Sequence, residues 1–188
     1  MGFEKVAEEL DVELPSRFEL IVRGPSRTES DLAAVSVLRE NGDVRGVEVS
    51  GIGVPGEWYI ELPALLCRRG VDRIVLRAWG WWIGEGSPPA DVRIVDHIAC
   101  HLPGPLTGTE AARMGEAFVG MRGAYESGET GDEGVVAWHT MDAGKPERDE
   151  IEAARRAGCE LGSPSIAPWV TGARASGIEV EAYARVVS

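Results

Sequence analysis

Short apolar runs alternate along the chain with segments whose apolar residues recur at helical spacing. Apolar runs typical of buried strands occupy 18–22, 44–50, 71–78, 92–98, 135–139 and 178–187. Segments typical of helices lie at 28–38, 58–66, 110–121 and 146–157. Strands that alternate with helices usually form a parallel or mixed sheet with helices packed against it. The pattern therefore predicts an α/β fold: a three-layer-like single domain with a central mixed, mostly parallel sheet flanked by helices.

Local signals support several of these boundaries. The segment 28–38 opens with polar residues that cap helices, and 146–157 has a proline in its first turn with Gly158 just beyond its end. Glycines and three tryptophans follow the strand predicted at 71–78, at Trp79, Trp81 and Trp82. We expect that tryptophan-rich stretch to be a loop.

The composition fits one soluble domain over residues 1–188. Apolar residues make up 44% of the chain and charged residues 27%, which are ordinary globular values. The formal net charge is −12, so most of the surface repels a polyanion. We therefore expect a small-molecule substrate, and neither nucleic acid nor a membrane as partner. A few arginines in one cleft can still reverse the local field for a small anion.

The cysteines and the N-terminus point to the cytoplasm. Cys67, Cys100 and Cys159 are far apart and form no pair with metal-binding spacing. The first residues carry glutamates where a signal peptide needs a basic and then an apolar segment. No apolar run reaches the roughly 20 residues of a membrane span. We expect a cytoplasmic protein.

Three glycine-containing loops follow predicted strands, at 24–27, 51–56 and 77–86. In an open α/β sheet, ligands bind at the carboxyl ends of the strands, where glycine lets the backbone approach them. Gly51 and Gly53 do not complete a dinucleotide fingerprint, because Pro55 interrupts the helix turn before the next glycine. We therefore expect no nicotinamide cofactor. The alternative is that these loops are only tight exits from strands.

The order of these loops resembles the nucleoside phosphorylase superfamily. An apolar strand runs into Gly24-Pro25-Ser26-Arg27, as in the family's first phosphate loop, and Gly51-Ile52-Gly53-Val54-Pro55 is similar to its Gly-(Met/Ile)-Gly-x-Pro loop. Three further stretches resemble later strands and the acidic motif of that family, namely 70–77, 90–96 and 157–161 with 177–180. The resemblance spans about residues 18–188 and implies that fold.

The resemblance also implies roles for individual residues. Arg27 and Arg77 correspond to the arginines that hold phosphate, which would be a co-substrate, and no resident cofactor or metal is implied. Gly51 and Gly53 fall in the loop that approaches the substrate, and Glu160 takes the first acidic position of the family's carboxylate motif. The family's habit of burying helix faces between subunits implies a homo-oligomer. The alternative for both arginines is a solvated surface position.

The chain differs from the family at the residues that take part in the reaction. Trp79 and Trp81 stand where the family has small residues beside phosphate and base, so indole rings would either fill that volume or stack on a larger flat ligand. Gly162 replaces the glutamate that binds ribose hydroxyls, and the sequence stops at Ser188, before the family's aspartic general acid. We therefore look for replacement groups.

His139, Thr140 and Asp142 are the candidate replacements. They follow the strand 135–139, where the family has a strand that lines the substrate pocket. Histidine titrates near neutral pH, so His139 and Asp142 are candidate acid and base. The alternative is a structural histidine and a turn aspartate. His97 and His101 do not form a metal pair, because the strand expected there separates residues four apart.

Two functions remain open on this reasoning. The first is an enzyme acting on the N-glycosidic bond of a nucleoside-like or heterocyclic small molecule, as a phosphorylase (transferase) or nucleosidase (hydrolase) of nucleoside metabolism, or repurposed for a bulkier and more apolar ligand. The second is a non-catalytic binding or scaffold subunit on the same fold.

Overall fold

The computed structural model describes residues 3–24, 34–50, 54–99, 124–125, 134–140 and 143–187. Its strands are β1 (Arg17–Val22), β2 (Ala34–Glu40), β3 (Asp43–Ser50), β4 (Arg73–Trp82), β5 (Asp91–Ile98), β6 (Val135–His139), β7 (Leu161–Ser163) and β8 (Glu179–Val187). Its helices are α1 (Phe3–Glu9), α2 (Trp58–Arg68), α4 (Arg148–Arg156) and α5 (Ile166–Ala175). The predicted helix at 110–121 lies outside the described residues.

The strands form one mixed sheet in the order β2-β3-β1-β4-β7-β6-β5-β8, and β8 also pairs with β4. This second pairing closes β4, β7, β6, β5 and β8 into a ring, from which β1, β3 and β2 extend. Most neighbours are parallel, and the antiparallel pairs are β2–β3, β4–β7 and β5–β8. The prediction of a mixed, mostly parallel sheet is confirmed, but the expectation of an open layered sheet is wrong because the sheet closes into a barrel.

Small residues allow this closure. Ala78 of β4 is the register partner of Ala184 of β8, and Ala184 in turn pairs with Val92 of β5. A side chain at Gly80 would meet the carbonyl oxygen of Gly162 at 2.7 Å. A ring of so few strands has a narrow interior, so bulky side chains at these positions would force the strands apart.

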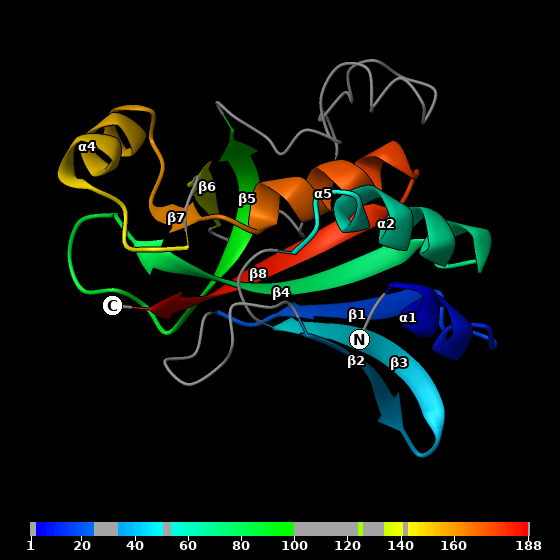
Figure 1. Cartoon of the computed structure of the whole chain (residues 1–188). Coiled ribbons are helices and arrows are strands. Elements are labelled where there is room, and N and C mark those ends of the chain that lie inside the picture. Colours follow the sequence, from blue (N-terminus) through cyan, green and yellow to red (C-terminus); the bar gives the residue numbers. More distant parts are fainter. Residues whose placement is uncertain are drawn as a thin grey trace.

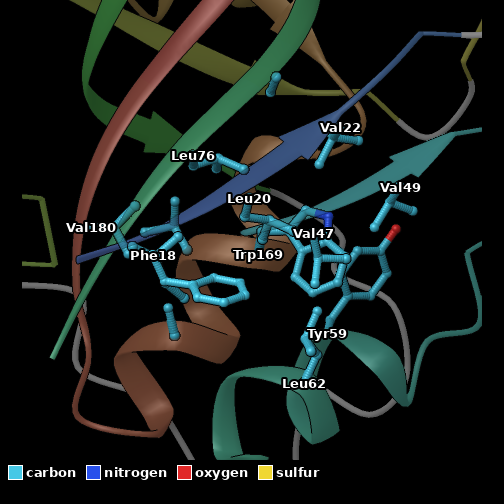
Figure 2. Packing of buried hydrophobic residues seen from close by; sticks show 14 of the residues in the cluster. Phe18, Leu20, Val22, Val47, Val49, Tyr59, Leu62, Leu76, Trp169 and Val180 are labelled. Carbon is cyan, nitrogen blue, oxygen red and sulfur yellow. The ribbon is translucent and has the colours of Figure 1, made fainter. Parts of the chain in front are cut away.

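The main core lies between the sheet and helices α1, α2 and α5. Figure 2 shows Phe18 and Leu20 of β1 pointing toward Leu62 of α2 and Trp169 of α5. The rings of Phe3 and Trp58 meet edge to face at 5.7 Å, which puts α1 on the same side as α2. Helices α2 and α5 run side by side there (Figure 1).

The opposite side of the sheet carries charged residues. Arg17 of β1 pairs with Glu181 of β8 at 2.6 Å, and Arg73 of β4 pairs with Glu179 at 3.4 Å. The strands alternate apolar and charged positions, which explains why one side is covered by helices and the other faces solvent.

A smaller core holds α4 against the barrel. Ala154 and Cys159 pack with Ile83, and Trp138 of β6 joins them. The Trp138 indole donates a hydrogen bond to Glu150 Oε1 at 3.3 Å, which fixes α4 over β6.

Two sequence predictions are wrong. The predicted helix at 28–38 is contradicted by β2, which pairs antiparallel with β3 across the turn Asn41-Gly42. Asn41 has φ 53° and Gly42 φ 96°, the conformation of a tight hairpin turn that this dipeptide favours. The predicted tryptophan loop is strand instead, because pairing with β7 and β8 extends β4 to Trp82.

Three described elements had no counterpart in the prediction. They are α1, the short strand β7 and helix α5. Residues 157–161, matched to the family's acidic motif, form a turn that leads into β7.

The close crossing of α2 and α5 gives a stability prediction. A side chain at Gly172 would lie 1.6 Å from the carbonyl oxygen of Tyr59. Alanine normally favours a helix over glycine by about 1 kcal/mol, yet we expect Gly172→Ala to lower the free energy of unfolding by about 2 kcal/mol or more because the helices must separate. Chemical denaturation measures this. The control is Gly144→Ala, whose side chain would meet nothing within 4 Å, and equal stability of the two variants would contradict the packing.

Candidate functional site

The carboxyl ends of β1 and β6 lie beside the second half of β4. β4 is parallel to β1 and antiparallel to β7, and β6 is parallel to β7, so β6 runs opposite to β4. His139 at the end of β6 is the register partner of Ser163 at the end of β7. The topology thus brings side chains from the carboxyl ends of separate strands to one place, as expected for a ligand site in an α/β protein.

Trp79 fills the space beneath the end of β1. Its side chain is buried, with 6% of the residue exposed. A side chain at Gly24 would lie 3.0 Å from the Trp79 ring, so the backbone of Gly24 packs directly on the indole. The sequence is compatible with an indole that fills the volume beside phosphate and base and with an indole that stacks on a ligand. The burial of Trp79 supports the first of these.

Trp81 lies next to Trp79 and is more accessible. The two rings meet edge to face, with centroids 6.2 Å apart, and Lys145 Nζ lies 5.8 Å from the centre of the Trp81 ring. The indole nitrogen of Trp81 is buried and has no hydrogen-bond partner among the described residues. An unsatisfied buried donor costs about 1–3 kcal/mol, and a ligand acceptor would remove that cost.

Ser163 connects the strand ends beneath the tryptophans. Its buried hydroxyl donates to the carbonyl oxygen of Trp79 at 2.7 Å and lies 3.4 Å from the Ser165 hydroxyl. Its own carbonyl accepts a hydrogen bond from the Thr140 N–H at 3.2 Å. Ser163 was not among the sequence candidates, because a lone serine in a short strand carries no motif.

The structure brings His139 and Thr140 to this cluster. Both lie at the end of β6, with Thr140 buried and His139 half-buried. A side chain at Gly162 would lie 3.2 Å from Thr140 Cγ2, so glycine there keeps β7 close to β6. His139 and Thr140, at the end of β6, therefore lie one short strand away from Trp79 and Trp81, which belong to the second half of β4.

Arg77 lies on the same side of β4 as Trp79, two residues earlier. Its side chain is 53% exposed, and its Nε lies 3.9 Å from Glu19. The guanidinium also lies over the Tyr183 ring, 5.5 Å from its centre. Arg77 therefore belongs to the solvent-facing side of the sheet, next to the tryptophan pair.

Glu160 lies at the other end of β7 from Ser163. It is exposed, and its carbonyl accepts hydrogen bonds from the N–H groups of Ile83 and Gly84. The three residues of β7 span about 10 Å, so the Glu160 carboxylate lies away from His139. The remaining candidates, Arg27, Gly51, Gly53 and Asp142, lie outside the described residues.

A separate polar pair links β5 to the segment at Tyr125. His97 Nδ1 lies 2.6 Å from the Tyr125 hydroxyl, and the His97 N–H donates to Asp96 Oδ1 at 2.7 Å. Burial lowers the pKa of His97 below its ordinary 6.5, while the nearby Asp96 charge opposes that shift. Burial raises the pKa of Tyr125.

Neither a metal cluster nor a membrane helix occurs in the described parts. Across residues 3–24, 34–50, 54–99, 124–125, 134–140 and 143–187, no group of three or more histidine, cysteine, aspartate or glutamate side chains could hold a metal ion. Among the helices of those same residues, none is long and apolar enough to span a bilayer.

Comparison with solved structures identifies the fold. A purine nucleoside phosphorylase from Schistosoma in complex with guanosine superposes with a TM-score of 0.62 over 97% of this chain and 84% of its own, at 18% identity. The Schistosoma mansoni enzyme in complex with inosine gives the same TM-score over 97% of this chain and 81% of its own, also at 18% identity. This chain has a nucleoside phosphorylase-like fold.

The likeness is one of structure. No protein-family model matches the sequence, and no curated protein matches it. At this identity the comparison establishes the nucleoside phosphorylase-like fold, and the chemistry has to be argued from the residues at the strand ends.

The hydrogen bonds of Ser163 give a second prediction. Ser163→Ala leaves the Trp79 carbonyl without this donor, and we expect the free energy of unfolding to fall by about 1–2 kcal/mol. The control is Ser36→Ala, because Ser36 is exposed on β2. Denaturant unfolding followed by tryptophan fluorescence measures both. Equal stability of the two variants would contradict the role of Ser163.

The burial of His97 predicts a dependence of stability on pH. Below pH about 6.5 the unfolded chain protonates this histidine more readily than the folded chain, so the folded state loses stability as the pH falls. We expect His97→Gln to flatten the fall in melting temperature between about pH 7 and pH 5. A variant with the same pH slope as the parent would contradict the burial of a neutral His97.

Proposed function

We propose that this chain is an enzyme that acts on the N-glycosidic bond of a nucleoside-like or other heterocyclic small molecule. The observation that supports the proposal is that His139 and Thr140, at the end of β6, lie one short strand away from Trp79 and Trp81 of β4, in a nucleoside phosphorylase-like fold. The related structures hold guanosine, hypoxanthine or inosine. A ligand of similar chemistry is the natural expectation for this chain.

The burial of Trp79 supports a ligand that differs from an ordinary ribonucleoside. The buried indole occupies the space beneath Gly24. The flat, apolar part of a ligand would lie against Trp81, whose buried N–H needs an acceptor. Heterocyclic bases combine a flat face with ring nitrogens and carbonyls that accept hydrogen bonds. Because Trp79 fills its volume, we propose that the ligand lies farther out than a nucleoside would, with a bulkier, more apolar part against Trp81.

His139 is the proposed proton donor. Cleavage of an N-glycosidic bond leaves electrons on the departing base, which needs a proton, while positive charge develops on the sugar carbon. An imidazole titrates near neutral pH and can supply that proton. Asp142 is the proposed partner that stabilises positive charge, and Arg27 and Arg77 are proposed to hold phosphate if the reaction is phosphorolytic.

Ligand screening and one variant pair test the proposal. Any ligand that binds only the folded form raises the melting temperature, so purine and pyrimidine nucleosides, their bases and phosphate are screened by thermal shift. Ligands that bind are then assayed for release of the free base. We expect His139→Gln to lower the rate of base release by about 100-fold or more, in line with the usual effect of a general acid.

The matched control is His97→Gln, because His97 lies on β5 in a separate polar pair. It should leave the rate of base release close to that of the parent, because the His97 side chain contacts Tyr125 and no residue of the proposed site. Ligand binding without any turnover would favour the non-catalytic alternative. A screen without any stabilising nucleoside or base would refute the proposed function.

A further inference from the structure

The solvent-facing side of β4 and β8 carries a pair of arginines beside the tryptophans. Arg77 of β4 has Tyr183 of β8 as its register partner, and Trp79 has Arg185. The two guanidinium groups therefore come from neighbouring strands, one pair apart along the ladder. We refer to Arg77, Tyr183 and Arg185 as the arginine patch.

The hydrogen-bonding capacity of these two arginines is unused within the described residues. Arg77 is 53% exposed, and its contact with Glu19 is an ion pair at 3.9 Å, too long for a hydrogen bond. Glu19 is also shared with Arg45 at 3.6 Å. The described ranges give Arg185, which is exposed, no ion pair, although Asp91 is its register partner across β5.

The nearest carboxylate on β8 is already engaged. Glu181 pairs with Arg17 at 2.6 Å and accepts a hydrogen bond from the Tyr183 hydroxyl at 2.5 Å. The Tyr183 ring lies under Arg77, which holds the guanidinium in place over an aromatic face. On a chain with a net charge of −12, the arginine patch is thus a place where positive charge is incompletely neutralised.

Position links the patch to the proposed site. Arg77 precedes Trp79 by two residues and Arg185 pairs with Trp79, so the Cα atom of each arginine lies about 5–7 Å from that of Trp79. Planar guanidinium groups bind phosphate and carboxylate through parallel hydrogen bonds. One small ligand can place a ring against Trp81 and an oxyanion on the arginine patch.

We infer that the ligand of this chain carries its own oxyanion, a phosphate or carboxylate, that binds to Arg77 and Arg185. This inference rests on the proposed function, because it names the class of ligand for the same proposed site. The ligand class is then a nucleotide-like or carboxylated heterocycle rather than a neutral nucleoside. Neither Arg185 nor Tyr183 belongs to the motifs that carried the resemblance.

Calorimetric titration with matched ligands tests this. The probes are a purine nucleoside, its 5′-monophosphate, inorganic phosphate and phenyl phosphate, each measured at low and at high salt. We expect the monophosphate to bind at least about tenfold more tightly than the nucleoside, the usual gain from a charge-assisted hydrogen bond. We expect high salt to reduce that gain, because both arginines are exposed.

Three variants assign the effect to the patch. Arg77→Gln and Arg185→Gln should each bring the affinity for the monophosphate close to the affinity for the nucleoside. Arg17→Gln is the control, because it removes the same charge from the same side of the sheet but from an arginine already bound to Glu181. It should keep the gain.

The outcomes separate this inference from the proposed function. Equal affinity for nucleoside and monophosphate, or a gain that survives both arginine variants, overturns the inference and leaves the proposed function standing. Arginine-dependent binding of inorganic phosphate without any gain for the monophosphate also overturns it, since the anion is then a separate molecule. If no nucleoside or monophosphate binds, the proposed function fails, and arginine-dependent binding of phenyl phosphate would still support an aromatic oxyanion ligand.

Discussion

The double pairing of β8 is the constraint on which the structure depends. β8 runs parallel to β4 on one side and antiparallel to β5 on the other, which closes the sheet. A closed ring of few strands needs small side chains where the strands pack, and β4 and β8 have the buried residues Ala78, Ala182 and Ala184 there. The short strand β7 alone separates the end of β6 from the second half of β4, which brings the histidine of β6 near the tryptophans of β4.

In that region, Trp79 decides how much room a ligand has. The indole packs against Gly24, and the Ser163 hydroxyl donates a hydrogen bond to the backbone carbonyl of Trp79. We propose that filling this space moves the binding surface outward, toward Trp81 and Lys145. The arginine patch lies along the same side of the sheet, which supports our proposal of an anionic heterocycle in place of a neutral nucleoside.

Part of the site followed from the sequence because it depends on local order. A strand that ends in His139 and Thr140 places both at a carboxyl end wherever that strand lies in the sheet. The sequence did not predict which residues lie beside His139 and Thr140, because that depends on the register between strands. Ser163 meets His139 only because β7 is parallel to β6, and Glu160 lies away from the cluster because the segment matched to a carboxylate motif forms a turn and a strand.

The sequence by itself determined the α/β class, most strands and helices α2 and α4, since these rest on apolar periodicity and on glycine and proline at element ends. It also held a signal that the helix prediction for 28–38 overlooked, the Asn41-Gly42 pair, whose positive φ angles favour a hairpin. Only the tertiary structure decided that Trp79 to Trp82 continue a strand and that the sheet closes. Both outcomes depend on hydrogen bonds to β7 and β8, some 80 to 100 residues further along the chain, and no local pattern records such partners.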